Sequence, residues 1–123
     1  MSEGNRAKLQ ALKILWQARD ITGALAKLGE LKGASNVSPY LLALEASLIQ
    51  LQDDENGRHL SDAEQCLLEA HAIDPKDLGV LCDLSHFYDA VMGDAVNAAR
   101  FAKEFLKVRD RLSEGIEEIA NAG

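Results

Sequence analysis

Apolar residues recur at steps of three and four through most of the chain, which is the spacing of one face of an α-helix. The pattern predicts a first helix over about residues 5–19 and a second that begins at Asp20 or Thr22 and ends near Leu31, where Gly33 suits a C-cap. A third helix over residues 40–51 is apolar nearly all round, so we expect it to be buried on several sides.

Three further helices are predicted in the second half of the chain. One begins near Ser61 and ends before Ile73-Asp74-Pro75, the next ends before Gly93-Asp94, and the last runs over about residues 94–120. The last segment is either one long helix or a helix with a terminal cap broken near Gly115.

An alanine followed by apolar residues four and seven positions later recurs in the second helix of each predicted hairpin. The three sets are Ala24, Leu28 and Leu31; Ala63, Leu67 and Ala70; and Ala98, Ala102 and Phe105. Small residues at these positions let neighbouring helices approach closely. We therefore predict one all-α domain over residues 1–123, made of antiparallel hairpins at about 5–33, 39–73 and 77–112 with a C-terminal extension at 113–123.

The three alanines are separated by 39 and 35 residues, which is close to the repeat length of about 34 residues in tetratricopeptide repeats. The polar stretch at residues 52–57 accounts for the longer interval as an extended loop inside the middle hairpin. Together with Leu84-Ser85, Tyr88 and Gly93-Asp94, these residues resemble the tetratricopeptide repeat (TPR) family, most closely between Tyr40 and Lys107.

The resemblance implies a stack of about three hairpins whose first helices line a concave groove for a protein or peptide. Transferred to this sequence, the groove positions fall on one face of the first helix and on one face of the fifth. These positions are Arg6, Lys13, Trp16 and Gln17 at one end, and Gly79, Cys82, Asp83, His86 and Asp89 at the other. Trp16 is either an anchor for the partner or a core residue.

The net charge of -7 is unevenly distributed along the chain. Residues 1–33 have a net charge of +3, residues 34–98 have -10, and the remainder is neutral. An acidic middle repels phosphates and excludes a nucleic-acid partner, whereas it favours a basic protein surface. Asp83 and Asp89 also argue against capture of a C-terminal carboxylate, for which TPR proteins use Lys, Arg and Asn.

The apolar runs are too short for a membrane span, and the interrupted segment at residues 9–16 cannot be a secretory leader. We therefore expect a cytoplasmic protein without a membrane partner.

Two groups of residues are candidates for chemical sites. Cys66, His71, Cys82 and His86 would have to converge to bind zinc, and Asp83, His86 and Asp89 would support acid-base chemistry. Cys66 and His71 point in different directions on a helix, and no phosphate loop, nucleophile elbow or metalloprotease motif is present. We expect no enzyme activity, no metal and no cofactor.

The sequence thus predicts a protein-interaction module, an adaptor or chaperone of TPR type. A narrower version is an inhibitor or immunity protein that binds a basic partner. The alternative is a structural, self-assembling protein that forms a homodimer through its C-terminal helix.

Overall fold

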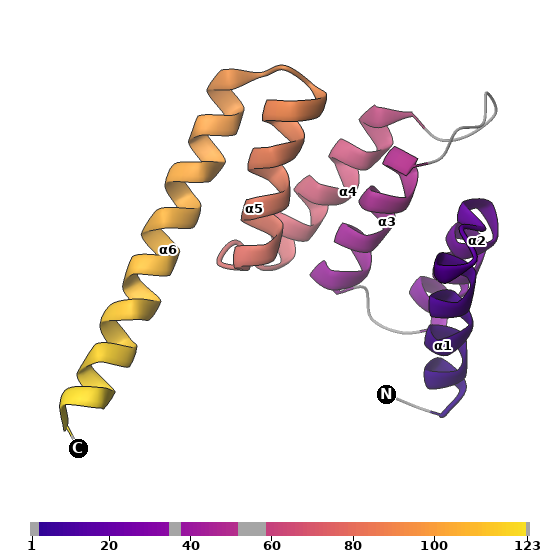
Figure 1. Cartoon of the computed structure of the whole chain (residues 1–123), viewed down its shortest axis with the longest axis horizontal. Helices are drawn as coiled ribbons and strands as arrows, with labels where there is room; N and C mark the ends of the chain where they lie inside the picture. Colours follow the sequence, from indigo (N-terminus) through magenta and orange to yellow (C-terminus); the bar gives the residue numbers. More distant parts are fainter. Residues whose placement is uncertain (1–2, 35–37, 52–58, 123) are drawn as a thin grey trace. The chain divides into compact units, whose positions relative to one another are not determined.

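The computed structural model describes residues 3–34, 38–51 and 59–122, and these residues contain helices but no strand. The all-α prediction is confirmed. Figure 1 labels the helices. The chain divides into two compact units, Met1–Ile73 and Asp74–Gly123. The single domain and the TPR stack stay predictions.

The described residues of the first unit form four helices, α1 (Glu3–Gln17), α2 (Ile21–Ala34), α3 (Pro39–Leu51) and α4 (Leu60–Ile73). Each helix packs against the next along the chain, so α1 with α2 and α3 with α4 form the two predicted hairpins. Leucine and alanine make up most of the core. Its buried apolar residues are Leu12, Ala24, Leu25, Leu28, Leu31, Leu41, Leu42, Ala46, Leu48, Ile49, Ala63, Cys66, Leu67 and Ala70.

The turn between α1 and α2 differs from the prediction, because α1 ends at Gln17 and not at Arg19. Arg19 has a left-handed backbone with φ of 62°, and the amide of Asp20 donates to the carbonyl of Leu15 at 2.9 Å. This is the hydrogen bond that closes a Schellman C-cap. The Asp20 carboxylate then accepts from the amide of Gly23 at 2.9 Å, which confirms Asp20 as a capping residue of α2.

The prediction that Gly33 ends the second helix is wrong, because α2 continues to Ala34. The start of α3 is one residue earlier than predicted, at Pro39, where proline is favoured because the first helical amide has no partner. Ser38 caps this helix through a hydrogen bond from the amide of Leu41 to its Oγ at 3.2 Å. The extended loop predicted at residues 52–57 lies outside the described residues.

Among the first-unit residues whose burial the structure describes, one charged residue lies in the core. Glu45 on α3 is 3% exposed, and its Oε1 accepts from Nζ of Lys32 on α2 at 2.6 Å. A buried carboxylate requires a partner of opposite charge. The ion pair therefore ties α2 to α3, although α3 reads as apolar in the sequence.

The second unit is a single hairpin of α5 (Leu78–His86), the π-helical turn η1 (Phe87–Val91) and α6 (Ala95–Ala122). The α5 helix begins at an N-cap, where Asp77 accepts from the amide of Val80 at 3.1 Å. The amide of Met92 then donates to the carbonyl of Phe87, five residues back, at 3.0 Å. The turn to α6 passes through Gly93, whose φ of 64° suits glycine.

The α6 helix is continuous through Gly115, so of the two forms predicted the long helix is the one observed. Asp94 caps it by accepting from the amide of Asn97 at 3.1 Å. The core between α6 and the first half of the hairpin contains a stacked pair, Tyr88 and Phe101, with ring centroids 5.7 Å apart.

The recurring alanines all lie in the core of their units. Ala24 and Ala63 are 0% exposed and Ala98 is 8% exposed. Burial of all three agrees with the predicted alignment of the hairpins, since a small side chain there allows helices to pack closely.

Candidate partner-binding surfaces

An apolar groove opens between α1 and α3 in the first unit. It has a volume of about 230 Å³ and will be called the α1–α3 groove. Its lining residues are Leu9, Leu12, Lys13, Trp16, Tyr40 and Leu44. Spacing explains the contribution of α1, because residues 9, 12, 13 and 16 share one helical face.

Two aromatic side chains and one ammonium group give this groove its chemistry. Trp16 is half-buried, Tyr40 is 65% exposed, and Lys13 is exposed. Large aromatic side chains with solvent access are common anchors for partner proteins, because they bury much apolar area at small entropic cost. The groove can accept a bulky apolar side chain, and Lys13 can bind a carboxylate beside it.

Of the four α1 residues predicted to bind a partner, Lys13 and Trp16 are brought together in this groove. Arg6 and Gln17 are exposed on the same helix, but they are not among the described residues that line it. The structure places Trp16 between the two predicted roles, since it is neither fully buried nor fully exposed.

The predicted residues of the second unit lie along one face of α5. Gly79, Asp83 and His86 are exposed on this face, and Cys82 is half-buried and has a free thiol. We call these four residues the α5 face. Desolvation raises the pKa of the Asp83 carboxyl above its usual range, an effect that nearby His86 opposes and Asp77 reinforces.

A second, shallower groove of about 340 Å³ lies between the first half of this hairpin and α6, and will be called the α5–α6 groove. It brings together His86 and Asp89, which were both predicted, with Ser85. Four alanines of α6 form its other wall: Ala95, Ala98, Ala99 and Ala102. Asp89 lies in the π-helical turn and lines this groove, whereas Asp83 lies on α5 and is not among the described residues that line it.

The two sets of predicted residues therefore belong to two units. One continuous groove, basic at one end and acidic at the other, stays a prediction.

Sequence reasoning missed Tyr40 and Leu44 as groove residues and Ser85 as a neighbour of His86. Tyr40 begins a helix that reads as buried on all sides, so its exposure is not visible in the pattern. The hydroxyl of Ser85 donates to the carbonyl of Cys82 at 2.9 Å, a local bond typical of serine in helices.

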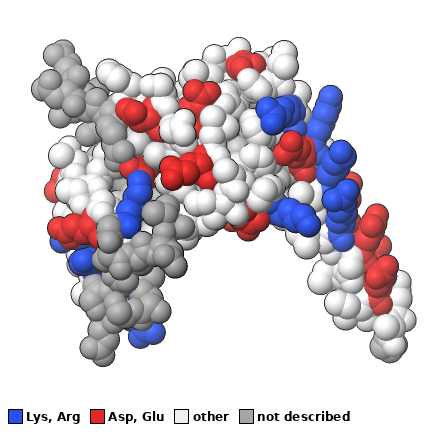
Figure 2. Space-filling model, turned by 180° about the vertical axis from the view of Figure 1, so that it is seen from behind, with Lys and Arg blue, Asp and Glu red and all other residues white. Residues whose placement is uncertain are grey.

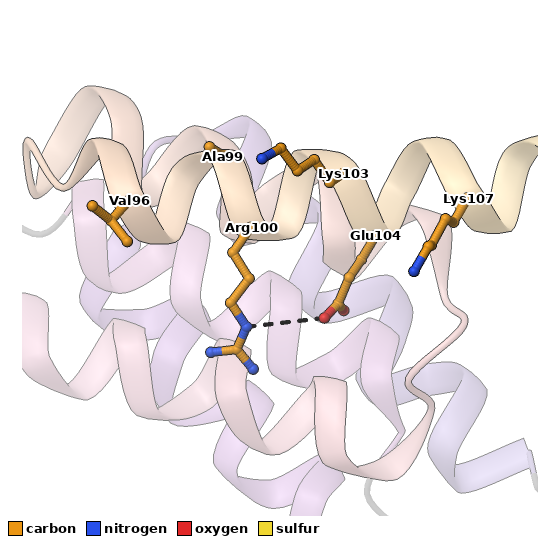
Figure 3. A pocket seen from close by; sticks show the side chains of 6 residues that line it. All are labelled: Val96, Ala99, Arg100, Lys103, Glu104 and Lys107. Atoms are coloured by element: carbon orange, nitrogen blue, oxygen red, sulfur yellow. Dashed lines mark ion pairs between the residues drawn. The ribbon is translucent and has the colours of Figure 1, made fainter.

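A third hollow, of about 510 Å³, is lined by α6 alone (Figure 3). Its residues are Val96, Ala99, Arg100, Lys103, Glu104 and Lys107. Arg100 Nε lies 3.9 Å from Glu104 Oε1, a separation that gives only a weak surface ion pair. Because one helix supplies every lining residue, this is a basic strip of surface and not an enclosed site.

Within the described residues, no group of three or more His, Cys, Asp or Glu side chains is arranged to bind a metal ion. Cys66 and His71 lie on α4 in the first unit, whereas Cys82 and His86 lie on α5 in the second. The same part of the chain contains no helix long and apolar enough to cross a membrane.

No protein-family model matches this chain, and no significantly similar curated protein or solved structure was found.

Proposed function

We propose that this protein is a non-enzymatic interaction module that binds a protein or peptide partner through the α1–α3 groove. The observation that supports this function best is the convergence of Trp16, Tyr40 and Lys13 around an apolar hollow. A ligand with one bulky apolar side chain and an acidic residue beside it would satisfy all three side chains.

The acidic residues of the second unit supply a second contact, with a basic surface of the partner. Asp83 on the α5 face and Asp89 in the α5–α6 groove are exposed, so they act by long-range attraction. Such charges accelerate association and select the partner more than they add affinity. This two-surface binding fits an adaptor or chaperone of TPR type in the cytoplasm, and in its narrower form an inhibitor or immunity protein for a basic target.

The groove is tested with peptides selected from a displayed random library against the full chain. Trp16 is the only tryptophan, so its fluorescence reports binding at the groove itself. We expect selected peptides to contain a bulky apolar residue and to change the Trp16 emission on titration.

The variant Tyr40→Ala removes an exposed wall of the groove and keeps the Trp16 probe. We expect Kd to rise about tenfold, which corresponds to about 1.4 kcal/mol. Ile14→Ala is the matched control, because Ile14 is also an exposed apolar residue, 57% exposed, but is not among the described residues lining the groove. Equal Kd values for wild type and Tyr40→Ala would contradict binding in the groove.

The acidic surface is tested with Asp83→Lys/Asp89→Lys and a basic peptide from the same selection. The association rate should fall and its dependence on salt should weaken, since the attracting charges are reversed. Glu30→Lys/Glu69→Lys changes the net charge by the same amount at exposed positions of the first unit and is the control. If both double variants slow association equally, net charge and not this surface attracts the partner.

A further inference from the structure

Within the described residues of the second unit, the apolar stripe of α6 becomes steadily more exposed toward the C-terminal end of the helix. The stripe begins at the buried Phe101 and continues through Phe105 and Val108, which are half-buried. It then passes to Leu112, Ile116 and Ile119, which are 56%, 66% and 73% exposed. These residues recur at steps of three and four, so they share one face of the helix.

The exposure follows from the lengths of the two halves of the hairpin. At about 1.5 Å per residue, the 28 residues of α6 span about 42 Å, whereas the 14 residues of α5 and η1 span about half of that. An unsupported helical end of this length is marginal in water, the more so with Gly115 in its interior. The regular stripe is therefore the face of a helix that gains a packing partner.

Charges along α6 indicate which partner fits. Residues 100–111 contain five basic and two acidic side chains, whereas residues 112–122 contain three acidic and no basic ones. Figure 2 shows this change from blue to red side chains along α6. A second copy of the helix complements this pattern when it runs in the opposite direction, and opposes it when it runs in the same direction.

We propose that two copies of this chain pair through α6 in an antiparallel coiled coil whose two-fold axis lies between Leu112 and Gly115. In heptad terms Leu112 and Ile119 occupy a positions, Val108 and Gly115 occupy d positions, and Ile116 lies beside this seam at an e position. Residues at a face residues at d across an antiparallel pair. This register sets Leu112 against Gly115 of the second copy, and Val108 against Ile119 of the second copy.

The fit at the centre depends on Gly115. A Cβ placed on Gly115 meets nothing within 4 Å, so the unit itself gives no packing reason for a glycine there. In the pair, the missing side chain leaves room for Leu112 of the second copy, and two large-against-small contacts result.

The charged residues at the edge of the stripe select this register. Glu104, Arg111 and Glu118 follow one edge at seven-residue intervals, and this edge faces the same edge of the partner in an antiparallel pair. In the proposed register Arg111 lies opposite Glu118 of the second copy, and the two-fold axis gives the dimer two such contacts. A slip of one heptad either way would place Glu118 against Glu118, or Arg111 against Arg111, and like charges would repel.

The dimer uses neither groove, so the test of dimerisation does not depend on the proposed function. Sedimentation velocity of the full chain over a wide concentration range measures it directly. We expect reversible monomer and dimer in the wild type, and monomer only in Ile119→Glu. Val96→Glu is the matched control, since Val96 is 81% exposed on the opposite side of α6, and should dimerise as the wild type does.

The direction and register are tested by exchanging charges. Arg111→Glu should weaken the dimer at least tenfold, and Arg111→Glu/Glu118→Arg should restore it, because the double variant rebuilds both cross-pairs. Circular dichroism of each variant checks that the chain remains helical. A wild type that stays monomeric at every concentration, a dimer that survives in Ile119→Glu, or a charge exchange that fails to restore pairing would each overturn the proposal.

Discussion

Replacing Ala63 by leucine tests the packing logic on which the three hairpins depend. Ala63 is 0% exposed on α4, the helix that packs against α3, and it aligns with Ala24 and Ala98. Leucine adds three carbon atoms at a site with no access to solvent. The neighbouring helices must then separate, or the side chain must leave its preferred rotamer.

Overpacking of this kind costs about 1 to 3 kcal/mol. Helix propensity contributes little, because alanine and leucine are both good helix formers. In a unit of this size each kcal/mol lowers the melting temperature by about 4–8 °C. We therefore expect a decrease in Tm of at least about 4 °C for Ala63→Leu.

The assays are thermal and urea unfolding, both followed by Trp16 fluorescence, which reports on the unit that contains Ala63. Ala26→Leu is the control, since Ala26 is exposed on α2 and leucine there should change stability by no more than about 0.5 kcal/mol. If Ala63→Leu and Ala26→Leu unfold at the same urea concentration, α4 can move without cost and the alignment of the alanines has no packing basis.

Three further predictions concern single contacts. Lys32→Met removes an ammonium partner of buried Glu45 and should lower the free energy of unfolding in urea by about 1–3 kcal/mol, which is less than the full cost of breaking a buried pair because Lys32 is partly exposed. The double variant Lys32→Met/Glu45→Leu should recover most of this lost stability. An unchanged free energy of unfolding in Lys32→Met would count against the ion pair. Arg19→Gly should stabilise the chain by about 0.5–1 kcal/mol by relieving the left-handed backbone, and a loss of stability would contradict that reading. Hydrogen bonds from the backbone and side chain of Asn97 lower the pKa of Asp94, so this carboxylate stabilises the fold above the unfolded pKa of about 4, and the contribution is lost as pH falls through the lowered value. Asp94→Asn should therefore flatten the dependence of the free energy of unfolding on pH in that acid range. If the wild type and Asp94→Asn give the same dependence on pH, the cap does not titrate.

The helices of this chain could be predicted from the sequence because the apolar spacing and the turn-forming residues indicate the same boundaries. Pro75 and Gly93 mark turns whatever surrounds them, since each restricts or frees the backbone locally. The end of α1 was missed because no such turn-forming residue marks it. Arg19 occupies a left-handed position that glycine normally takes, so the sequence carried no sign of the turn.

The site was only partly predictable, because exposure depends on which elements meet. Lys13 and Trp16 were found through their shared helical face, but Tyr40 comes from a helix whose pattern indicates burial. Glu45 shows the converse, since a carboxylate is ordinarily a surface residue and its contact with Lys32, which comes from another helix, supports its place in the core. Long-range contacts of this kind leave no periodic signal.

The alanine spacing also limits what the resemblance to TPR proteins can mean. Any antiparallel hairpin that packs closely needs small residues at the crossing, so Ala24, Ala63 and Ala98 are required by packing whatever the ancestry of the chain. Function has to be sought where packing leaves a residue without a structural reason. Tyr40 over an open groove and Ile119 on an uncovered helix are such residues, because water opposes the exposure of both side chains. These two positions, more than the repeat pattern, determine which surfaces of this protein to test first.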